Sequence, residues 1–205
     1  MNLIESRTTQ TISYIFLGFA AFVALFPMAL MLLNSFKPAA AIIQNPLAWP
    51  EVYRWDNFTR AWQDAKFSRT FLNSAILTIM TIVLVCTTGS MTAYVLARKK
   101  VKFWRLLTGY LLATTTAPIQ LFMFPIYFAF ARLGLINNVF AVAFIYCALF
   151  SPFSIMLMRT YFLAVPKELE QAAIVDGATH WQVFFRVLLP IVWPGILTVA
   201  LLVGL

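Results

Sequence analysis

One short segment, residues 168–186, brings together several groups that could do chemistry. Its sequence, ELEQAAIVDGATHWQVFFR, contains two glutamates, an aspartate, an arginine and His180, the only histidine of the chain. Carboxylates and an imidazole can act as general acids and bases, but no serine or cysteine nucleophile pattern accompanies the histidine. The chain also has no glycine-rich phosphate-binding loop, and its cysteines lack metal-ligand spacing. We therefore expect no catalytic residue, no metal site and no hydrolysis of ATP by this chain itself.

The rest of the sequence has the composition of a membrane protein. Hydrophobic residues make up 62% of the chain and charged residues 11%, whereas about a quarter of residues are charged in soluble domains. Four charge-free runs exceed the roughly 20 residues that a membrane-spanning helix needs: residues 8–36, 70–97, 106–131 and 133–158. A fifth apolar run begins near Val187 and continues to Leu205. The sequence predicts an all-α integral membrane protein, one transmembrane domain over residues 1–205, with its last span incomplete and its C-terminal part missing.

The loops between these runs predict the orientation of the chain. Residues 98–105, RKKVKFWR, contain five basic residues and no acidic one, and short basic loops remain in the cytoplasm. The N-terminus and residues 159–189 are then also cytoplasmic, and residues 37–69 lie outside. The net charge of +8 would also suit a nucleic-acid partner, but the basic residues are spread over loops. We therefore attribute the charge to this positive-inside bias and expect no nucleic acid.

The outer segment, residues 37–69, has a pattern of its own. Trp55, Phe58 and Trp62 recur at helical spacing among charged residues, which predicts a short amphipathic helix. This helix either anchors the segment at the outer membrane surface or offers a contact surface to an external partner.

The predicted spans contain few polar groups. No ionisable residue lies within the four complete runs, which argues against a proton-driven transporter but leaves sodium sites built from carbonyl groups open. The most polar run is the third, with TTTAPIQLFMFP at residues 114–125. Its two prolines predict a bent helix that either faces a cavity or a partner, or simply packs against other helices. The residues that we expect in a translocation pathway are Asn73, Gln120, Phe122 and Tyr127.

Residues 166–190 predict two helices joined by a sharp turn. Pro166 suits a first helical turn, and the acidic residues after it favour a helix start. Asp176 and Gly177 can end this helix, with the glycine in the left-handed conformation. Thr179 can cap a second helix that leads into the fifth span. One face of the first helix would carry Leu169, Ala172, Ala173 and Asp176, and its small side chains would let another protein approach closely.

The same segment resembles a cytoplasmic signature of ABC importer membrane subunits: E-A-A, three residues, G, nine residues, I-x-L-P. Here Gln171-Ala172-Ala173 is followed by three residues and Gly177, and nine more lead to Val187-Leu188-Leu189-Pro190. The departures are Gln171 for Glu and Val187 for Ile. Further stretches resemble the carbohydrate-uptake branch, especially its maltose-type second permease: FPMALMLLNSFKP (26–38), FLNSAILT (71–78), FPIYFAFARLGLINN (124–138) and PKELEQAAIVDGA (166–178).

This resemblance implies a fold and a docking site. The fold is the helical bundle of the type I ABC importer permease (MetI-like), which has six spans, of which five are seen here. The cytoplasmic loop 159–189 would contain a coupling helix that docks in a cytoplasmic ATPase. The docking residues would be Glu168, Leu169, Gln171, Ala172, Ala173, Asp176 and Gly177. In the family the glutamate of E-A-A is expected to pair with a basic residue of the ATPase. Gln171 keeps the hydrogen bonding but loses the charge, and Glu170 points about 100° round the helix.

The resemblance also implies an assembly in the lipid of the bacterial or archaeal cytoplasmic (inner) membrane. A second related permease would complete the pathway, and an extracytoplasmic solute-binding protein would deliver a sugar or sugar-like solute. Two ATPase subunits would use ATP and Mg, while this chain would bind no cofactor. Glycerol-phosphate or polyamine importers are alternatives within the same class. An ion-coupled secondary transporter or channel is disfavoured by the charge-free spans and the docking loop, and a membrane-embedded enzyme by the lack of catalytic groups.

Overall fold

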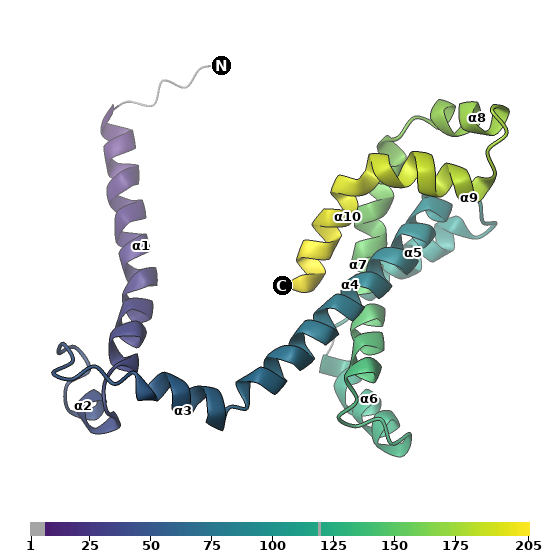
Figure 1. The fold of residues 1–205 in the computed structure, drawn as a ribbon. Helices are drawn as coiled ribbons and strands as arrows, with labels where there is room; N and C mark the ends of the chain where they lie inside the picture. Colours follow the sequence, from purple (N-terminus) through teal and green to yellow (C-terminus); the bar gives the residue numbers. More distant parts are fainter. Residues whose placement is uncertain (1–6, 119) are drawn as a thin grey trace. The chain divides into compact units, whose positions relative to one another are not determined.

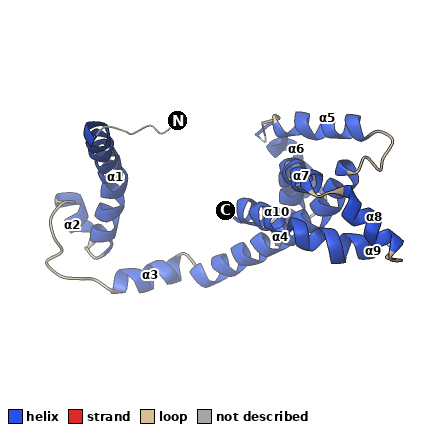
Figure 2. Ribbon diagram, turned by 90° about the horizontal axis from the view of Figure 1, so that it is seen from above, coloured by secondary structure: helices blue, strands red, loops and turns tan. Residues whose placement is uncertain are grey.

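The fold was analysed in a computed structural model, which describes residues 7–118 and 120–205. Every regular element in these residues is helical, and they contain no strand (Figure 2). The chain divides into two compact units, residues 1–70 and residues 71–205, and each is described by itself below. The predicted all-α class is therefore confirmed.

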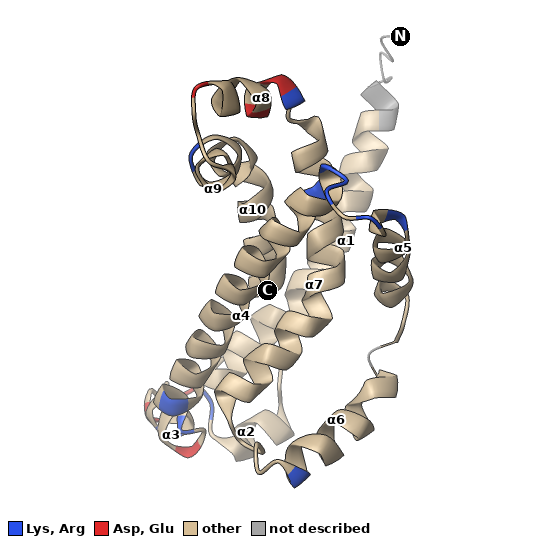
Figure 3. Cartoon of the chain, turned by 90° about the vertical axis from the view of Figure 1, so that its right-hand side faces the viewer, with Lys and Arg blue, Asp and Glu red and all other residues tan. Residues whose placement is uncertain are grey.

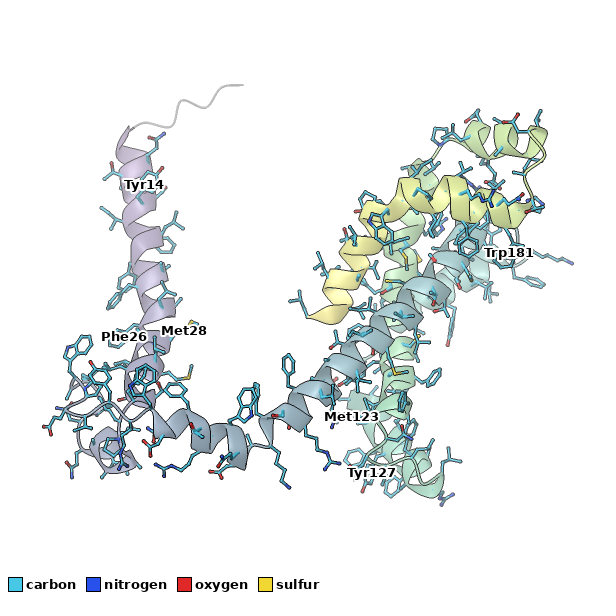
Figure 4. All side chains as sticks on the ribbon, viewed as in Figure 1. Tyr14, Phe26, Met28, Met123, Tyr127 and Trp181 are labelled. Carbon is cyan, nitrogen blue, oxygen red and sulfur yellow. The ribbon has the colours of Figure 1, made fainter. Side chains whose placement is uncertain are left out.

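The first unit begins with a long apolar helix, α1 (Arg7–Ser35), which contains Pro27 without a break. Apolar side chains along α1 are largely exposed, including Tyr14 (73%), Phe26 (42%) and Met28 (60%), which are labelled in Figure 4. A 29-residue helix with exposed apolar side chains is long enough to span a bilayer. Its side chains are therefore suited to contact lipid or another membrane helix.

The outer segment folds around the end of α1, and it contains α2 (Ala39–Gln44) and α3 (Asp56–Asp64) (Figure 1). The ring of Phe36 lies against the rings of Trp55 and Phe58, at centroid distances of 5.0 and 5.3 Å. The side-chain amide of Asn57 donates to the carbonyl oxygens of Ser35 and Lys37, both at 2.9 Å. The bond to Ser35 satisfies a carbonyl group that the end of α1 leaves free, and the bond to Lys37 holds the residues that follow. The predicted short helix is confirmed as α3, and its position at the membrane surface stays a prediction.

The second unit contains most of α4 (Phe67–Ala97) and all later helices. They are α5 (Trp104–Thr115), α6 (Gln120–Arg132), α7 (Val139–Ala164), α8 (Lys167–Val175), α9 (His180–Gln182), a π-helical segment η1 (Val183–Leu188) and α10 (Leu189–Gly204). The last three form one continuous helix, His180–Gly204. Across the described residues, four helices are long and apolar enough to cross a membrane, or five if α5 and α6 form one broken span.

The third apolar run is bent, as its prolines predict. Helices α5 and α6 meet at 96° across a break that contains Pro118, whereas Pro125 lies inside α6 without breaking it. Proline lacks the N–H that would continue the helix, and its ring restricts the preceding residue. Residue 119, which lies in this break, is outside the described residues.

The fourth span is shifted toward the C-terminus relative to the charge-free run at 133–158. Asn138 caps α7, because its side-chain oxygen accepts from the backbone N–H groups of Phe140 and Ala141. The helix then continues to Ala164, beyond Arg159. The first six residues of the predicted loop 159–189 are therefore helical, because a helix does not have to end where the charge-free run ends.

The core of the second unit lies where α4, α7 and the last helix meet. Its most deeply buried side chains include Val85, Leu96, Met158, Phe162, Val183, Leu188 and Val199. Two glycines bring these helices close together. A Cβ at Gly195 would lie 2.5 Å from the ring of Tyr161, and one at Gly89 would lie 2.5 Å from the methyl carbon of Met158. Small residues of this kind let membrane helices approach closely.

Candidate functional site

The turn between α8 and α9 has the geometry that its sequence predicts. Gly177 has φ +87°. Its N–H donates to the carbonyl of Ile174, and the N–H of Ala178 donates to that of Ala173, each at 3.0 Å. This pair of bonds is the Schellman motif, which ends a helix on a left-handed residue. Helix α8 begins after Pro166, one residue later than expected, and ends at this fixed turn.

The second helix is also capped as predicted. The Thr179 hydroxyl accepts from the backbone N–H of Gln182 at 3.3 Å, and the Gln182 side-chain oxygen accepts from the Thr179 N–H at 2.7 Å. This reciprocal arrangement is a capping box. Because the Schellman turn ends at Ala178 and the capping box begins at the next residue, Thr179, the angle between α8 and the following helix is tightly defined.

A buried charge cluster holds α8 against the C-terminal end of α4. The carboxylate of Glu170 accepts from the Tyr94 hydroxyl at 2.6 Å, from Lys100 Nζ at 2.8 Å and from Arg98 Nε at 2.9 Å. The Arg98 guanidinium also donates to the carbonyl oxygen of Val165, at the end of α7, at 3.2 Å. In Figure 3 the basic residues that follow α4 and the acidic residues of α8 lie at the same end of the unit. We call Tyr94, Arg98, Lys100 and Glu170 the Glu170 cluster.

Each charged side chain in this cluster stabilises the charged form of its partner. Burial raises the pKa of the Glu170 carboxyl, but the hydrogen bonds from Lys100, Tyr94 and Arg98 outweigh it, so that the net pKa lies below its ordinary value. Burial likewise lowers the pKa of Lys100, and the bonds to Glu170 and Tyr94 outweigh it, so that this pKa is raised. Both side chains therefore stay charged at neutral pH.

The opposite side of α8 is exposed. Six of the seven predicted docking residues are exposed, on α8 or in the turn after it: Glu168, Leu169, Gln171, Ala172, Asp176 and Gly177. The seventh, Ala173, is half-buried and packs against the core of the unit, on the same side as Glu170. The helix thus has an inner side fixed by ionic and apolar contacts. Its outer side is an exposed surface in which polar and apolar side chains alternate, suited to fit a groove of another protein.

Aromatic side chains continue this surface onto the next helix. Trp181 is 64% exposed and stacks on Phe185, at a centroid distance of 5.9 Å. Figure 4 labels Trp181 at the start of this helix. The π-helical segment η1 follows directly, and such segments occur frequently at functional sites.

The bend of the third run faces a cavity of about 710 Å³. Its lining includes Thr114, Thr115, Phe122, Ser151 and Pro152. Of the four predicted pathway residues, Phe122 lines this cavity. Asn73 on α4 and Gln120 and Tyr127 on α6 are exposed outside it. Their place in a pathway stays a prediction.

Comparison with known proteins identifies the family. Residues 86–204 match the family model described as "Binding-protein-dependent transport system inner membrane component". This range covers more than half of the chain and includes the Glu170 cluster and both capped helices. The chain belongs to this family.

Individual relatives agree with this assignment. The chain is 34% identical over 197 residues to the diacetylchitobiose uptake system permease protein NgcG of Streptomyces coelicolor, with 96% of this chain and 65% of that protein covered. It is 32% identical over 208 residues to the arabinooligosaccharides transport system permease protein AraQ of Halalkalibacterium halodurans, with 98% and 74% covered. The chain thus spans about two thirds of the length of such relatives. It is similar to relatives of the sugar-uptake branch that its sequence resembles.

A solved structure shows the same fold. The chain matches, with a TM-score of 0.82 and 25% identity, one chain of a bacterial ABC transporter involved in the import of the acidic polysaccharide alginate. The match covers 99% of this chain and 72% of the other. The predicted importer permease fold is therefore confirmed, and this permease is a multi-pass membrane protein.

The Glu170 cluster was not recognised from the sequence. The basic loop 98–105 predicts only the orientation of the chain, and Glu170, next to Gln171, could replace the missing glutamate at the docking surface only in part, because it points about 100° round the helix. Both carboxylate oxygens of Glu170 are occupied inside the subunit, so it does not fill that role. One signal is present in the sequence: the loop 98–105 has five basic residues and no acidic residue to balance them.

Proposed function

We propose that this permease is the membrane subunit of an ATP-driven importer for a sugar or sugar-like solute. The observation that carries the proposal is the exposed outer side of α8, held at a fixed angle, within a region that matches a binding-protein-dependent transport family. The sugar-uptake relatives support the solute class. In this proposal the chain is not an enzyme and forms half of the translocation pathway.

In the proposed assembly, other subunits supply the second half of the pathway, the hydrolysis of ATP and the delivery of the solute. A second related permease completes the pathway, two cytoplasmic ATPase subunits use ATP and Mg, and an extracytoplasmic solute-binding protein delivers the solute. The segment 166–190 is the contact with the ATPase. The N-terminus, residues 98–105 and residues 159–189 lie in the cytoplasm, as the basic residues at 98–105 favour.

Deletion of the gene tests the proposal. We expect cells without this chain to lose ATP-dependent uptake of at least one labelled oligosaccharide from a panel that includes diacetylchitobiose and arabino-oligosaccharides, and the restored gene to recover it. Unchanged uptake of every sugar, with loss of glycerol-phosphate or polyamine uptake, would assign the permease to another solute. Uptake abolished by an ionophore but not by ATP depletion would indicate an ion-coupled transporter.

A further inference from the structure

The Glu170 cluster joins two regions that are far apart in the sequence, residues 94–100 and residues 165–170. Glu170 comes from the middle of α8, Tyr94 from α4, and Arg98 and Lys100 from the turn after α4. Through Arg98 the cluster also reaches the carbonyl of Val165, which ends α7. A displacement of α8 therefore acts on the cytoplasmic ends of two long helices at one point.

The cluster is built for fixed geometry. The side chains of Arg98 and Glu170 are only 4% and 10% exposed, so water competes little for their hydrogen bonds. Charge-assisted bonds in such surroundings are short and directional. Burying charges is nevertheless costly, and apolar side chains of similar size often stabilise a fold at least as well. These properties favour a role of the cluster in positioning α8 rather than in overall stability.

Tyr94 extends this connection into the core. Its hydroxyl donates to Glu170, while its ring packs against Phe162 of α7 at a centroid distance of 5.8 Å and Phe184 of η1 at 5.4 Å. Phe162 and Phe184 are both almost fully buried. In a close-packed core, a shift of the tyrosine hydroxyl cannot be absorbed locally and displaces the neighbouring rings.

We propose that Glu170 is a positioning residue of the transport cycle, which makes α8, the cytoplasmic end of α4 and the end of α7 move as one body when the ATPase displaces α8. This proposal rests on the proposed function. The exposed residues of α8 make the contact with the ATPase, and Glu170 passes the resulting movement to the membrane helices. Without it, α8 keeps its angle to the following helix but is no longer tied to the ends of α4 and α7, so the movement does not reach them.

The test measures solute uptake and ATP hydrolysis in the same proteoliposomes, which contain the complete complex with its binding protein and a labelled oligosaccharide that the wild type imports. We expect Glu170→Gln, Tyr94→Phe and Lys100→Gln to keep ATP hydrolysis but to lower the uptake per ATP hydrolysed, by about fivefold or more for Glu170→Gln.

Lys99→Gln is the matched control, because the Lys99 ammonium lies 4.9 Å from the Trp104 ring, and no contact joins it to Glu170. This control should keep the wild-type ratio.

A merely structural role gives a different result. Uptake and hydrolysis would then fall together, and an unchanged ratio in the assembled Glu170→Gln complex would overturn the proposal. If Glu170→Gln does not assemble, Tyr94→Phe decides, since it removes one hydroxyl and leaves the ring packing intact. An unchanged ratio in that variant would also overturn it. A wild-type complex that shows no ATP-dependent uptake would instead contradict the proposed function.

Discussion

Glu168 and Glu170 are two residues apart on the same helix, yet they have opposite environments. Two residues correspond to about 200° around a helix, so one carboxylate is exposed while the other binds three donors inside the subunit. The exposed glutamate is available to a partner. The buried one belongs to the architecture of the loop itself.

The contribution of Glu170 to the free energy of unfolding should fall at acidic pH. The pKa of Glu170 is lowered in the folded loop, so its stabilising contribution is complete above the ordinary glutamate pKa of about 4.3 and is lost as the pH falls through the lowered value. At pH 7 we expect Glu170→Gln to reduce the free energy of unfolding by roughly 2–3 kcal/mol, because Arg98 stays buried without its counter-charge. Thermal unfolding in detergent should show this difference shrinking as the pH falls below about 5. A difference that does not change with pH would contradict the charged state of Glu170.

Gln171 is exposed next to this cluster and is free to meet a partner. If a basic residue of the ATPase faces this position, Gln171→Glu should restore an ion pair and increase the amount of ATPase that co-purifies with the permease at low salt, with the gain reduced at high salt. Gln63→Glu, on the exposed outer helix α3, adds the same charge elsewhere and should change nothing. A loss of the complex with Gln171→Glu would show that the docking surface requires the amide.

At the scale of elements, the turn between α8 and α9 depends on backbone conformation rather than on space. Nothing lies within 4 Å of a Cβ built on Gly177, but its φ is +87°. We therefore expect Gly177→Val to cost about 1–2 kcal/mol and to distort the turn, because β-branched residues rarely adopt this conformation.

Gly177→Asn is the matched control, since asparagine tolerates the left-handed region far better. We expect the valine variant to reach the membrane in normal amounts but to lose most uptake, and the asparagine variant to retain most of it. Equal uptake in the two variants would show that the angle of the turn does not matter for transport.

Helix packing in the core distinguishes two other glycines. In Gly195→Ala the new methyl group would lie 2.5 Å from atoms of the Tyr161 ring, which cannot fold away. We expect a loss of about 1–3 kcal/mol in the free energy of unfolding, as for other overpacked sites. In Gly89→Ala the clash is with the flexible end of Met158, which can rotate, so the loss should be clearly smaller. Thermal unfolding of the purified subunit measures both, and a reversed order would show that the α7 contact with α10 yields more easily than its contact with α4.

At the scale of the whole molecule, the charge pattern predicts which ends of the helices face the cytoplasm. In a background with Cys86→Ser and Cys147→Ser, a membrane-impermeant maleimide should label Asp64→Cys in spheroplasts. It should label Lys102→Cys only after the membrane is opened. Both positions are exposed at the ends of helices, so access is set by the side of the membrane. The opposite labelling pattern would reverse the proposed orientation.

Much of this protein is determined by local sequence. Charge-free runs of 26 or more residues require helices in a membrane, because lipid offers no hydrogen bonds to a free backbone. Pro118 breaks the third span, Gly177 ends α8 and Thr179 begins α9, since each effect depends on the residue's own backbone or side chain. These features involve neighbours within four residues and were therefore predictable.

The tertiary structure decided which side of α8 faces inward and what holds it there. Glu170 contacts Tyr94, Arg98 and Lys100, which lie 70 to 76 residues away in the chain. The helical spacing of residues predicts only contacts between near neighbours in the sequence. Helical spacing alone assigned Ala173 to the outer face, but Ala173 packs inward beside Glu170. The physical reason is that burial of a charge depends on the counter-charges that the whole fold brings to it. The sequence thus determined the loop, and only the packing of α4, α7 and α8 determined its inner side.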